Sequence, residues 1–404
     1  MVRIALACLA VLASASAAFP ATFTVAPDGT GDFPTIQAAL DASASGDVVE
    51  LADGVFTGDG NRDLDFLGKA LTLRSLGGPA ACAIDCEGSE TDQHRGIVFQ
   101  NDEGPGSVVE GVTIMHGWVD AYGGTYGGGI YCADDASPTI RNCVLHKNQA
   151  AYGGGMCGGA YSEISGCAFV ENEAVRGGGL GRSPHATITG CSFTGNLGTY
   201  GGGIYIRSSC SPTLTDCLFE GNEASHSGGA LHIEQHCNPV LRRCTLTGNS
   251  SPIGGAFDVS IECAPILHNC TLSGNSCAYT GTVSCYEYCV LTFENTIIAH
   301  EVEGQAVSCY DSEVALLCCD LYGNAGGDWV GYVADQLGSD GNICEDPLFC
   351  GDENPSAPYS LHNSSPCAPA YNPSCGLVGA WDVGCCATSV AETSWGAVKA
   401  TYAP

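Results

Sequence analysis

A six-residue phrase repeats through the middle of the chain and constrains the fold more than any other feature. The phrase reads Cys, any residue, an aliphatic residue or Phe, two further residues and Asn. Its six regular copies end at Asn148, Asn172, Asn196, Asn222, Asn249 and Asn275, which are 24 to 27 residues apart. A glycine-rich phrase such as Gly201-Gly-Gly-Ile204 precedes each copy. Self-similarity at a period of about 20–50 residues indicates an architecture of stacked repeats.

The repeat unit has the pattern of short strands and turns. Each unit contains alternating runs rich in Val, Ile, Thr, Tyr and Phe, which are separated by Gly, Asn, Ser and Pro. Because a strand advances about 3.3 Å per residue, one repeat predicts one coil of three short strands with their turns. Stacked coils then place equivalent strands side by side in parallel, about 4.8 Å apart.

Alternation along these strands predicts which side chains point inward. In the strand after Gly203, Ile204 and Ile206 are expected inside, with Tyr205 and Arg207 outside. The Cys and the Leu or Phe of each copy are also expected inside. We expect the Asn to turn the corner, where its amide can bond to the Asn of the neighbouring coils and form a ladder.

These phrases resemble the repeats of secreted bacterial right-handed parallel β-helix proteins of the pectate-lyase-like superfamily. The stretches at 25–40 and 346–380 also resemble the beginning and the end of such folds, so the resemblance spans roughly residues 22–386. It implies an all-β, right-handed parallel β-helix. It does not imply one activity, because this superfamily includes lyases, hydrolases, esterases, epimerases, adhesins and proteins with no known reaction.

We divide the chain into five segments, of which residues 19–386 form one solenoid domain. Residues 1–18 are predicted to be a signal peptide, because Arg3 precedes an apolar run and Ala15-Ser-Ala17 fits a cleavage site. The other segments are an N-terminal cap with the first coils (19–110), the regular coils (111–325), the last coils with a Cys-rich cap (326–386) and a tail (387–404). A short helix with Ile36, Ala39 and Leu40 on its apolar face is expected in the first cap. The protein is therefore expected to be secreted or held at the cell surface.

The charge of the chain limits its partners. Its 44 acidic and 13 basic residues give a net charge of −31, which disfavours binding to nucleic acid and to anionic membranes. It also disfavours polyuronates, unless a divalent cation bridges the two anions. No stretch after the signal has membrane-spanning length, and a monomer is expected.

Two series of cysteines recur with the coils. One runs from Cys143 to Cys270, and the other comprises Cys210, Cys237, Cys263 and Cys289. Export favours disulfides, but parallel Cβ vectors on successive coils stay about 4.8 Å apart, whereas a bridge needs about 3.8 Å. We therefore favour stacked, buried thiols. A metal site is disfavoured because a column with one Cys per coil lacks the paired spacing of zinc sites.

Other cysteines leave the pairing open. Cys82 and Cys86 fit a local disulfide as well as two free thiols. Residues 344–386 contain Cys344, Cys350, Cys367, Cys375, Cys385 and Cys386. This even set predicts a cap stapled by disulfides, with pairings that the sequence does not assign.

The candidate ligand-binding residues lie on the outward face of the strand that follows the glycines. They are Tyr205, Arg207, His232, Glu234, Asp258 and Tyr286. Tyrosines can stack on sugar rings, and charged groups can bond to sugar hydroxyls. Glu234 and Asp258 lie on adjacent coils, so this pair could divide acid and base roles or bind Ca²⁺. No Ca²⁺ motif supports such a site, no cofactor is predicted, and a solvated sheet face is the plain alternative.

The known catalytic motifs of the superfamily are absent from this sequence. We therefore favour an exported, non-catalytic module that binds carbohydrate or a surface partner. The alternative is a polysaccharide-active enzyme of lyase or glycoside-hydrolase type, with an unrecognised site near Glu234 and Asp258. A purely structural spacer of the cell surface is the third hypothesis.

Overall fold

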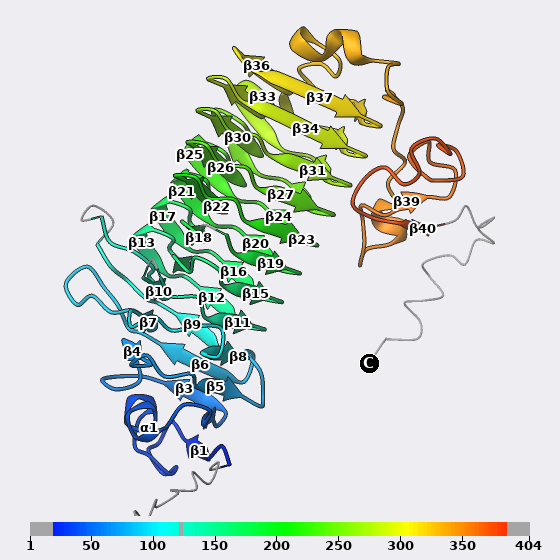
Figure 1. Cartoon of the computed structure of the whole chain (residues 1–404). Helices are drawn as coiled ribbons and strands as arrows, with labels where there is room; N and C mark the ends of the chain where they lie inside the picture. The colour runs from blue at the N-terminus through cyan, green and yellow to red at the C-terminus, as the bar shows by residue number, and fades with distance from the viewer. Residues whose placement is uncertain (1–18, 121–123, 134, 184, 386–404) are drawn as a thin grey trace, which may run out of the picture.

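The structure is a computed structural model that describes residues 19–120, 124–133, 135–183 and 185–385. The predicted signal peptide and tail lie outside these residues. The described part is an elongated stack of parallel coils (Figure 1). It contains one α-helix, α1 (Ile36–Ala42), and two 3-10 helices, η1 (Gly331–Gln336) and η2 (Gly351–Glu353). The predicted all-β, right-handed parallel β-helix is confirmed.

Sheet A is one long face of the stack and has 12 strands in the described residues. Its strands are β1 (Thr22–Val25), β2 (Val48–Leu51), β5 (Thr72–Ser75), β8 (Val108–Glu110), β11 (Thr139–Arg141), β15 (Glu163–Ser165), β19 (Thr187–Thr189), β23 (Thr213–Thr215), β27 (Val240–Arg242), β31 (Ile266–His268), β34 (Val290–Glu294) and β37 (Glu313–Leu317).

Sheet B is the second face and has 11 strands in the same residues. They are β3 (Gly54–Phe56), β6 (Cys82–Asp85), β9 (Thr113–Met115), β12 (Val144–His146), β16 (Ala168–Val170), β20 (Ser192–Thr194), β24 (Leu218–Glu220), β28 (Thr245–Thr247), β32 (Thr271–Ser273), β35 (Ile297–Ala299) and β38 (Asp320–Tyr322).

Sheet C consists of two ladders that join at β33 (Ser276–Tyr286). The main ladder contains β4 (Leu64–Asp65), β7 (Ile97–Phe99), β10 (Ile130–Cys132), β14 (Met156–Cys157), β18 (Leu180–Gly181), β22 (Ile204–Arg207), β26 (Leu231–Glu234) and β30 (Phe257–Ser260), and β36 (Glu303–Tyr310) pairs with β33. The outer ladder contains β13 (Gln149–Tyr152), β17 (Glu173–Arg176), β21 (Leu197–Tyr200), β25 (Glu223–Ser227) and β29 (Ser250–Ser251). The middle coils thus have an extra strand beyond the three expected per coil.

The glycine phrase forms the turn between the two ladders. Gly201 has a φ of +65°, and a Cβ atom there would lie 2.2 Å from the carbonyl oxygen of Ile204. Only glycine fits such a turn without strain. This explains why the phrase recurs at the same place in each coil.

The predicted asparagine ladder is confirmed. Asn148 donates from its backbone N and from Nδ2 to Oδ1 of Asn172, over 3.0 and 3.1 Å. The same pair of bonds recurs from coil to coil as far as Asn275. Next in the ladder is Glu301, which accepts from the backbone N of Asn275 over 2.5 Å. A carboxylate therefore takes the place of the amide at the coil where the phrase degenerates.

The cysteine columns are files of free, buried thiols, as predicted. A thiol of this kind accepts a backbone N–H from the preceding coil, as when Cys167 N donates to Cys191 Sγ over 3.4 Å. At the end of each column a hydroxyl takes this role, since Cys270 N donates to Thr296 Oγ1 and Cys289 N to Ser312 Oγ. Cys82 and Cys86 are also free and buried.

One inter-coil bridge contradicts the general geometric objection to such disulfides. Cys285 and Cys309 occupy the same position on β33 and β36 and form a disulfide with their Cα atoms 4.7 Å apart. That separation lies within the range that a disulfide spans. The objection was therefore too strict, because side-chain rotation can bring the two sulfurs together.

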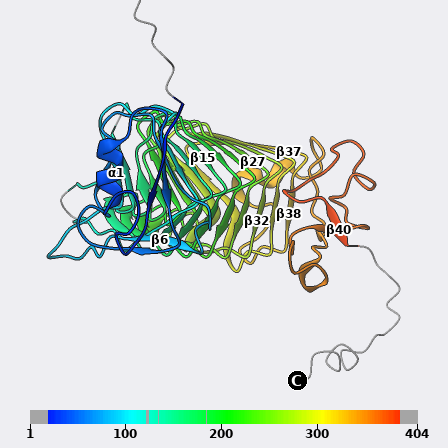
Figure 2. The ribbon, with the colours of Figure 1, turned by 90° about the horizontal axis from the view of Figure 1, so that it is seen from below.

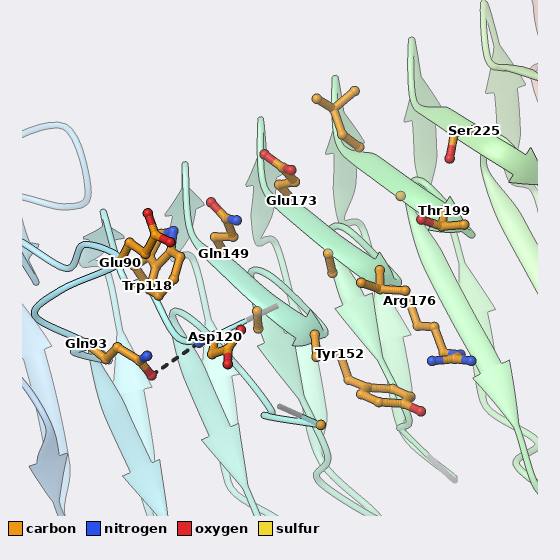
Figure 3. A pocket seen from close by; sticks show the side chains of 17 residues that line it. Glu90, Gln93, Trp118, Asp120, Gln149, Tyr152, Glu173, Arg176, Thr199 and Ser225 are labelled. Carbon is orange, nitrogen blue, oxygen red and sulfur yellow. Dashed lines mark hydrogen bonds between the residues drawn. The ribbon is translucent and has the colours of Figure 1, made fainter. Parts of the chain in front are cut away.

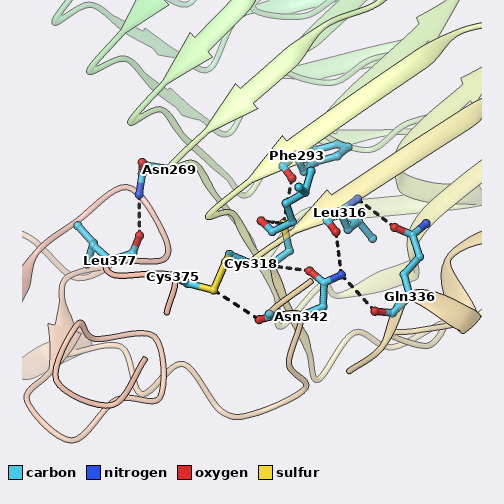
Figure 4. Close-up of a disulfide and its surroundings, with 11 residues drawn as sticks. Asn269, Phe293, Leu316, Cys318, Gln336, Asn342, Cys375 and Leu377 are labelled. Atoms are coloured by element: carbon cyan, nitrogen blue, oxygen red, sulfur yellow. Dashed lines mark hydrogen bonds between the residues drawn. A yellow bond between two sulfur atoms is a disulfide. The ribbon is translucent and has the colours of Figure 1, made fainter. Parts of the chain in front are cut away.

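The Cys-rich cap is stapled differently from the prediction. Cys350 pairs with Cys385 inside the cap, whereas Cys375 pairs with Cys318 of the last coil (Figure 4). Cys344 and Cys367 are free, and Cys386 lies outside the described residues. The even set was misleading because the partner of Cys375 belongs to the solenoid.

The cap packs on the outer face of sheet B. β39 (Leu361–His362) and β40 (Val383–Cys385) form a small sheet, and Leu361 and Val378 pack with Ile297. Trp381 Nε1 donates to Thr245 Oγ1 over 2.8 Å. Figure 2 shows α1 and the cap at opposite ends of the solenoid. Within the residues described, no helix is long and apolar enough to cross a membrane.

Candidate functional site

The structure brings the predicted site residues together on sheet C. Tyr205, His232 and Asp258 are register partners on β22, β26 and β30. Arg207, Glu234, Ser260 and Tyr286 form the neighbouring row. The two columns expected from the sequence are thus present, although no observation tests their role in binding.

The first column is not open to solvent, contrary to expectation. Tyr205, His232 and Asp258 are 1%, 2% and 0% exposed. The outer ladder lies against them, since the Tyr200 ring centroid is 5.4 Å from that of His232. Ser227 Oγ lies 2.9 Å from His232 Nδ1. The segment between the Asn and the glycines therefore covers side chains that alternation alone places on the surface.

His232 links the two carboxylates of the predicted pair. Its Nδ1 lies 2.8 Å from Asp258 Oδ2, and its Nε2 lies 3.6 Å from Glu234 Oε2. Burial opposes the charged imidazole, but hydrogen bonding and charge attraction from Asp258 and Glu234 outweigh it and raise the pKa of His232 to about 9. His232 is therefore a cation at neutral pH and holds the adjacent coils together.

Glu234 is engaged from three sides. Tyr205 donates its hydroxyl proton to Glu234 Oε1 over 2.5 Å, and Arg207 Nε lies 3.0 Å from the same oxygen. Burial tends to raise its pKa, but the bonds from His232 and Tyr205 dominate and lower the pKa of Glu234 to about 2. Such a carboxylate is ionised at neutral pH, so it has no proton to give as a general acid.

Tyr286 completes the predicted set at the edge of this network. It is half-buried at the end of β33, and burial raises its pKa. Taken together, the six predicted residues form a locked ionic and aromatic network. Their arrangement stabilises sheet C and leaves little of their polar surface for a ligand.

A groove that the sequence reasoning missed lies beside this network, over the outer ladder (Figure 3). Its volume is about 800 Å³. The polar and aromatic side chains that line it are Glu90, Gln93, Trp118, Asp120, Gln149, Tyr152, Glu173, Arg176, Thr199 and Ser225.

The groove arises from a pattern within β13, β17 and β21. Each strand has a small residue two positions after the ladder Asn, namely Ala150, Ala174 and Gly198, and these are register partners. Tyr152, Arg176 and Tyr200 stand four positions after the Asn and are register partners or near-partners in the same stack. This recurring small residue followed by Tyr or Arg was the signal in the sequence that could have indicated the groove.

Arg176 connects the groove to the buried network. Its Cζ atom lies 5.1 Å from the ring centroid of Tyr152, 5.6 Å from that of Tyr200 and 5.9 Å from that of Tyr205. Within the described part of the chain, Arg176 has no carboxylate at ion-pair distance. Three aromatic faces instead stabilise the cation, and its donors lie at the groove.

The chemistry of the groove is that of hydrogen bonding and ring stacking. Trp118 and Tyr152 are half-buried, which leaves aromatic surface for contact with a ligand. Glu90, Asp120 and Glu173 outnumber the single cation Arg176, so a polyanion is disfavoured. As for a metal such as Ca²⁺, the described residues contain no group of three or more His, Cys, Asp or Glu side chains that could hold one.

Comparisons with known proteins concern the fold. A family model described as the right handed beta helix region matches residues 180–343, and no curated protein matches the sequence. The structure is similar to that of pectate lyase Pel9A, with 12% identity, a TM-score of 0.47 and coverage of 91% of this chain and 97% of that chain. It is also similar to a pectin methylesterase from carrot, with 11% identity, a TM-score of 0.39 and coverage of 74% and 90%. At these identities the similarity does not extend to an activity.

Proposed function

The chain is a right-handed β-helix protein, and from that premise we propose that it binds neutral carbohydrate without catalysis in the groove over β13, β17 and β21. The observation that carries this proposal is the groove itself, where Trp118, Tyr152 and Arg176 stand beside carboxylate, amide and hydroxyl groups. Its volume of about 800 Å³ falls within the range of about 300–1,000 Å³ that is typical of small-molecule sites.

The charge of the groove supports a neutral ligand. Carboxylates and amides bond well to sugar hydroxyls, and aromatic rings cover the apolar faces of sugars. The excess of acidic groups in the groove adds to the net charge of −31, which disfavours polyuronates. Secretion or display at the cell surface fits this role, and the three disulfides of the described residues are compatible with it.

Binding by purified protein tests the proposal. We expect isothermal titration with cello-, xylo- and manno-oligosaccharides to give saturable binding to at least one series. The Trp118→Ala variant should bind that series about tenfold more weakly, since loss of one ring contact costs roughly 1–2 kcal/mol. Tyr161, which is 67% exposed and lies outside the groove, provides the matched control Tyr161→Ala. Absence of binding to every neutral series would overturn the proposal and leave a structural spacer as the favoured role.

A polysaccharide-active enzyme is the second candidate. The observation in its favour is that Glu90, Asp120 and Glu173 line one groove, because glycoside hydrolysis uses two carboxylates. Release of reducing sugar or of an unsaturated product from a bound polysaccharide, lost in Glu173→Gln, would support it. Binding without any product after prolonged incubation would support the non-catalytic role.

A further inference from the structure

We infer that the groove recognises the end of a glycan chain rather than an internal stretch. This inference rests on the proposed carbohydrate binding. The structural basis is an asymmetry, because a cross-running segment closes the groove at its N-terminal end while its other end meets solvent. The occupant would be the terminal sugars of a neutral polysaccharide, with the rest of the chain leaving past Ser225.

The closing segment runs against the direction of the stack. His94 and Trp118 form an antiparallel bridge, whereas the strands of the outer ladder pair in parallel. Trp118 N donates to His94 O over 2.8 Å, and His94 N donates to Trp118 O over 3.1 Å. Trp118 is also a bridge partner of Gln149 at the start of β13. Trp118 thus adds a rung to the ladder, and the segment that carries Glu90 and Gln93 crosses beyond it.

Polar contacts hold this segment in place. His94 Nδ1 lies 2.6 Å from Asp63 Oδ2, and the backbone N of Arg95 donates to Asp63 Oδ1 over 2.8 Å. On the groove side, Asp120 N donates to Gln93 Oε1 over 3.2 Å (Figure 3). The segment is therefore tied both to the preceding coil and to the last rung. A wall fixed in this way blocks a chain from passing through.

The opposite end has different surroundings. Leu197 is 45% exposed, and Ser225 and His226 on β25 are exposed. The pairing of β21 with β25 shifts in register between Gly198 and Tyr200, so the rungs change spacing where the groove ends. A chain that starts at Trp118 can leave here into solvent.

The dimensions fit a short terminal segment. Successive rungs are about 4.8 Å apart, so β13 to β21 spans about 10 Å along the groove. The first sugar would meet Trp118, Glu90 and Asp120, and the next would meet Arg176 and Glu173. A polymer that runs through in both directions would collide with the closing segment.

Chain length at constant mass tests this inference. Cello-, xylo- and manno-oligosaccharides are compared with size-fractionated polymers of the same series by isothermal titration with the full chain. We expect about one site per polysaccharide molecule, so the protein bound per gram should fall in inverse proportion to chain length. Protein bound per gram that stays constant as the chains lengthen would show internal binding and overturn chain-end recognition alone. Absence of binding to all series would overturn the proposed function as well.

The Trp118→Ala variant gives a second readout. Trp118 contacts the terminal sugar in this arrangement, so oligosaccharide and polymer should both lose affinity by about tenfold in this variant, as for one lost ring contact. The Tyr161→Ala control should bind as the parent protein does. A variant that loses oligosaccharide binding but keeps full binding to long polymer would contradict the inference.

Discussion

The guanidinium carbon of Arg176 lies 5.9 Å from the ring centroid of Tyr205, whose hydroxyl donates to Glu234. This contact joins an open groove to a buried ionic network on the next ladder. The network fixes the position of Tyr205, and the tyrosine helps to fix the cation that faces the groove. The residues predicted from the sequence thus act as support for a surface that the sequence reasoning did not identify.

Replacing Arg176 should weaken glycan binding more than it weakens the fold. Arg176→Ala removes hydrogen-bond donors from the groove, and a charged hydrogen bond contributes about 1.5–3 kcal/mol, which corresponds to a loss of affinity of roughly tenfold or more. Isothermal titration measures the loss, and denaturant unfolding measures stability. Arg242, an exposed arginine at the end of β27 on sheet A, is the matched control. Equal affinity for Arg176→Ala and Arg242→Ala would remove Arg176 from the site.

His232 should make stability fall on the alkaline side. Its pKa is raised to about 9 in the folded protein, against about 6.5 in an unfolded chain. The stabilisation is therefore fully present below about pH 6.5 and is lost as pH rises through 9, with an amplitude on the order of 3 kcal/mol. Urea unfolding between pH 6 and 10 should show this decline, and His232→Gln should lack it. The exposed His236 provides the control His236→Gln, which should retain the decline.

Glu301 should destabilise the asparagine ladder once it is ionised. Burial raises the pKa of Glu301 to about 8, whereas an unfolded Glu titrates near 4.3. Its stabilising, protonated state is favoured below the unfolded pKa, so stability falls as pH rises from about 4.3 to 8. Glu301→Gln should remove this slope and raise the unfolding free energy at pH 8 by a few kcal/mol. The exposed Glu313 supplies a control substitution to Gln, and an unchanged slope in Glu301→Gln would contradict the assignment.

The repeat phrase predicted the regular part of the fold because its information is local. Alternation determines which side of a strand faces inward, and each ladder Asn satisfies the turn of its own neighbour. The outer ladder was missed because Gln149-Ala-Ala-Tyr152 shows no clear alternation of apolar and polar residues. Its return over Tyr205 and His232 is a tertiary contact that no local pattern contains.

The cysteine pairings were beyond the sequence for a similar reason. Cys318 and Cys375 are separated by 57 residues, and only the docking of the cap on the last coil brings them together. The groove depends on the same kind of contact, since Trp118 closes it through pairing with His94 and Gln149. Local patterns therefore predicted the coils, while the site arises where segments of different coils meet.

The thiol columns should act as hydrogen-bond acceptors and not as disulfide precursors. Cys167 N donates to Cys191 Sγ over 3.4 Å, and Thr296 and Ser312 accept the equivalent bonds with hydroxyls. Cys191→Val should lower the unfolding free energy by about 1–3 kcal/mol, because it leaves a buried N–H without a partner. Cys191→Ser keeps an acceptor and should lose less. Equal losses in denaturant unfolding would argue that packing alone explains the column.

Mass spectrometry after alkylation checks the same columns in the native protein. Cys143, Cys167 and Cys191 are at most 2% exposed, so they should resist iodoacetamide until the chain unfolds. Peptides cross-linked between successive members of this column would contradict the account.

A crystal structure with a bound neutral oligosaccharide tests the central claim most directly. The account predicts density for the sugar between Trp118 and Arg176, with its terminal ring against the segment that carries Glu90 and Gln93. Density for the sugar elsewhere, for example in the cleft lined by Tyr288 and Tyr332, with the groove over β13, β17 and β21 filled only by water, would contradict it.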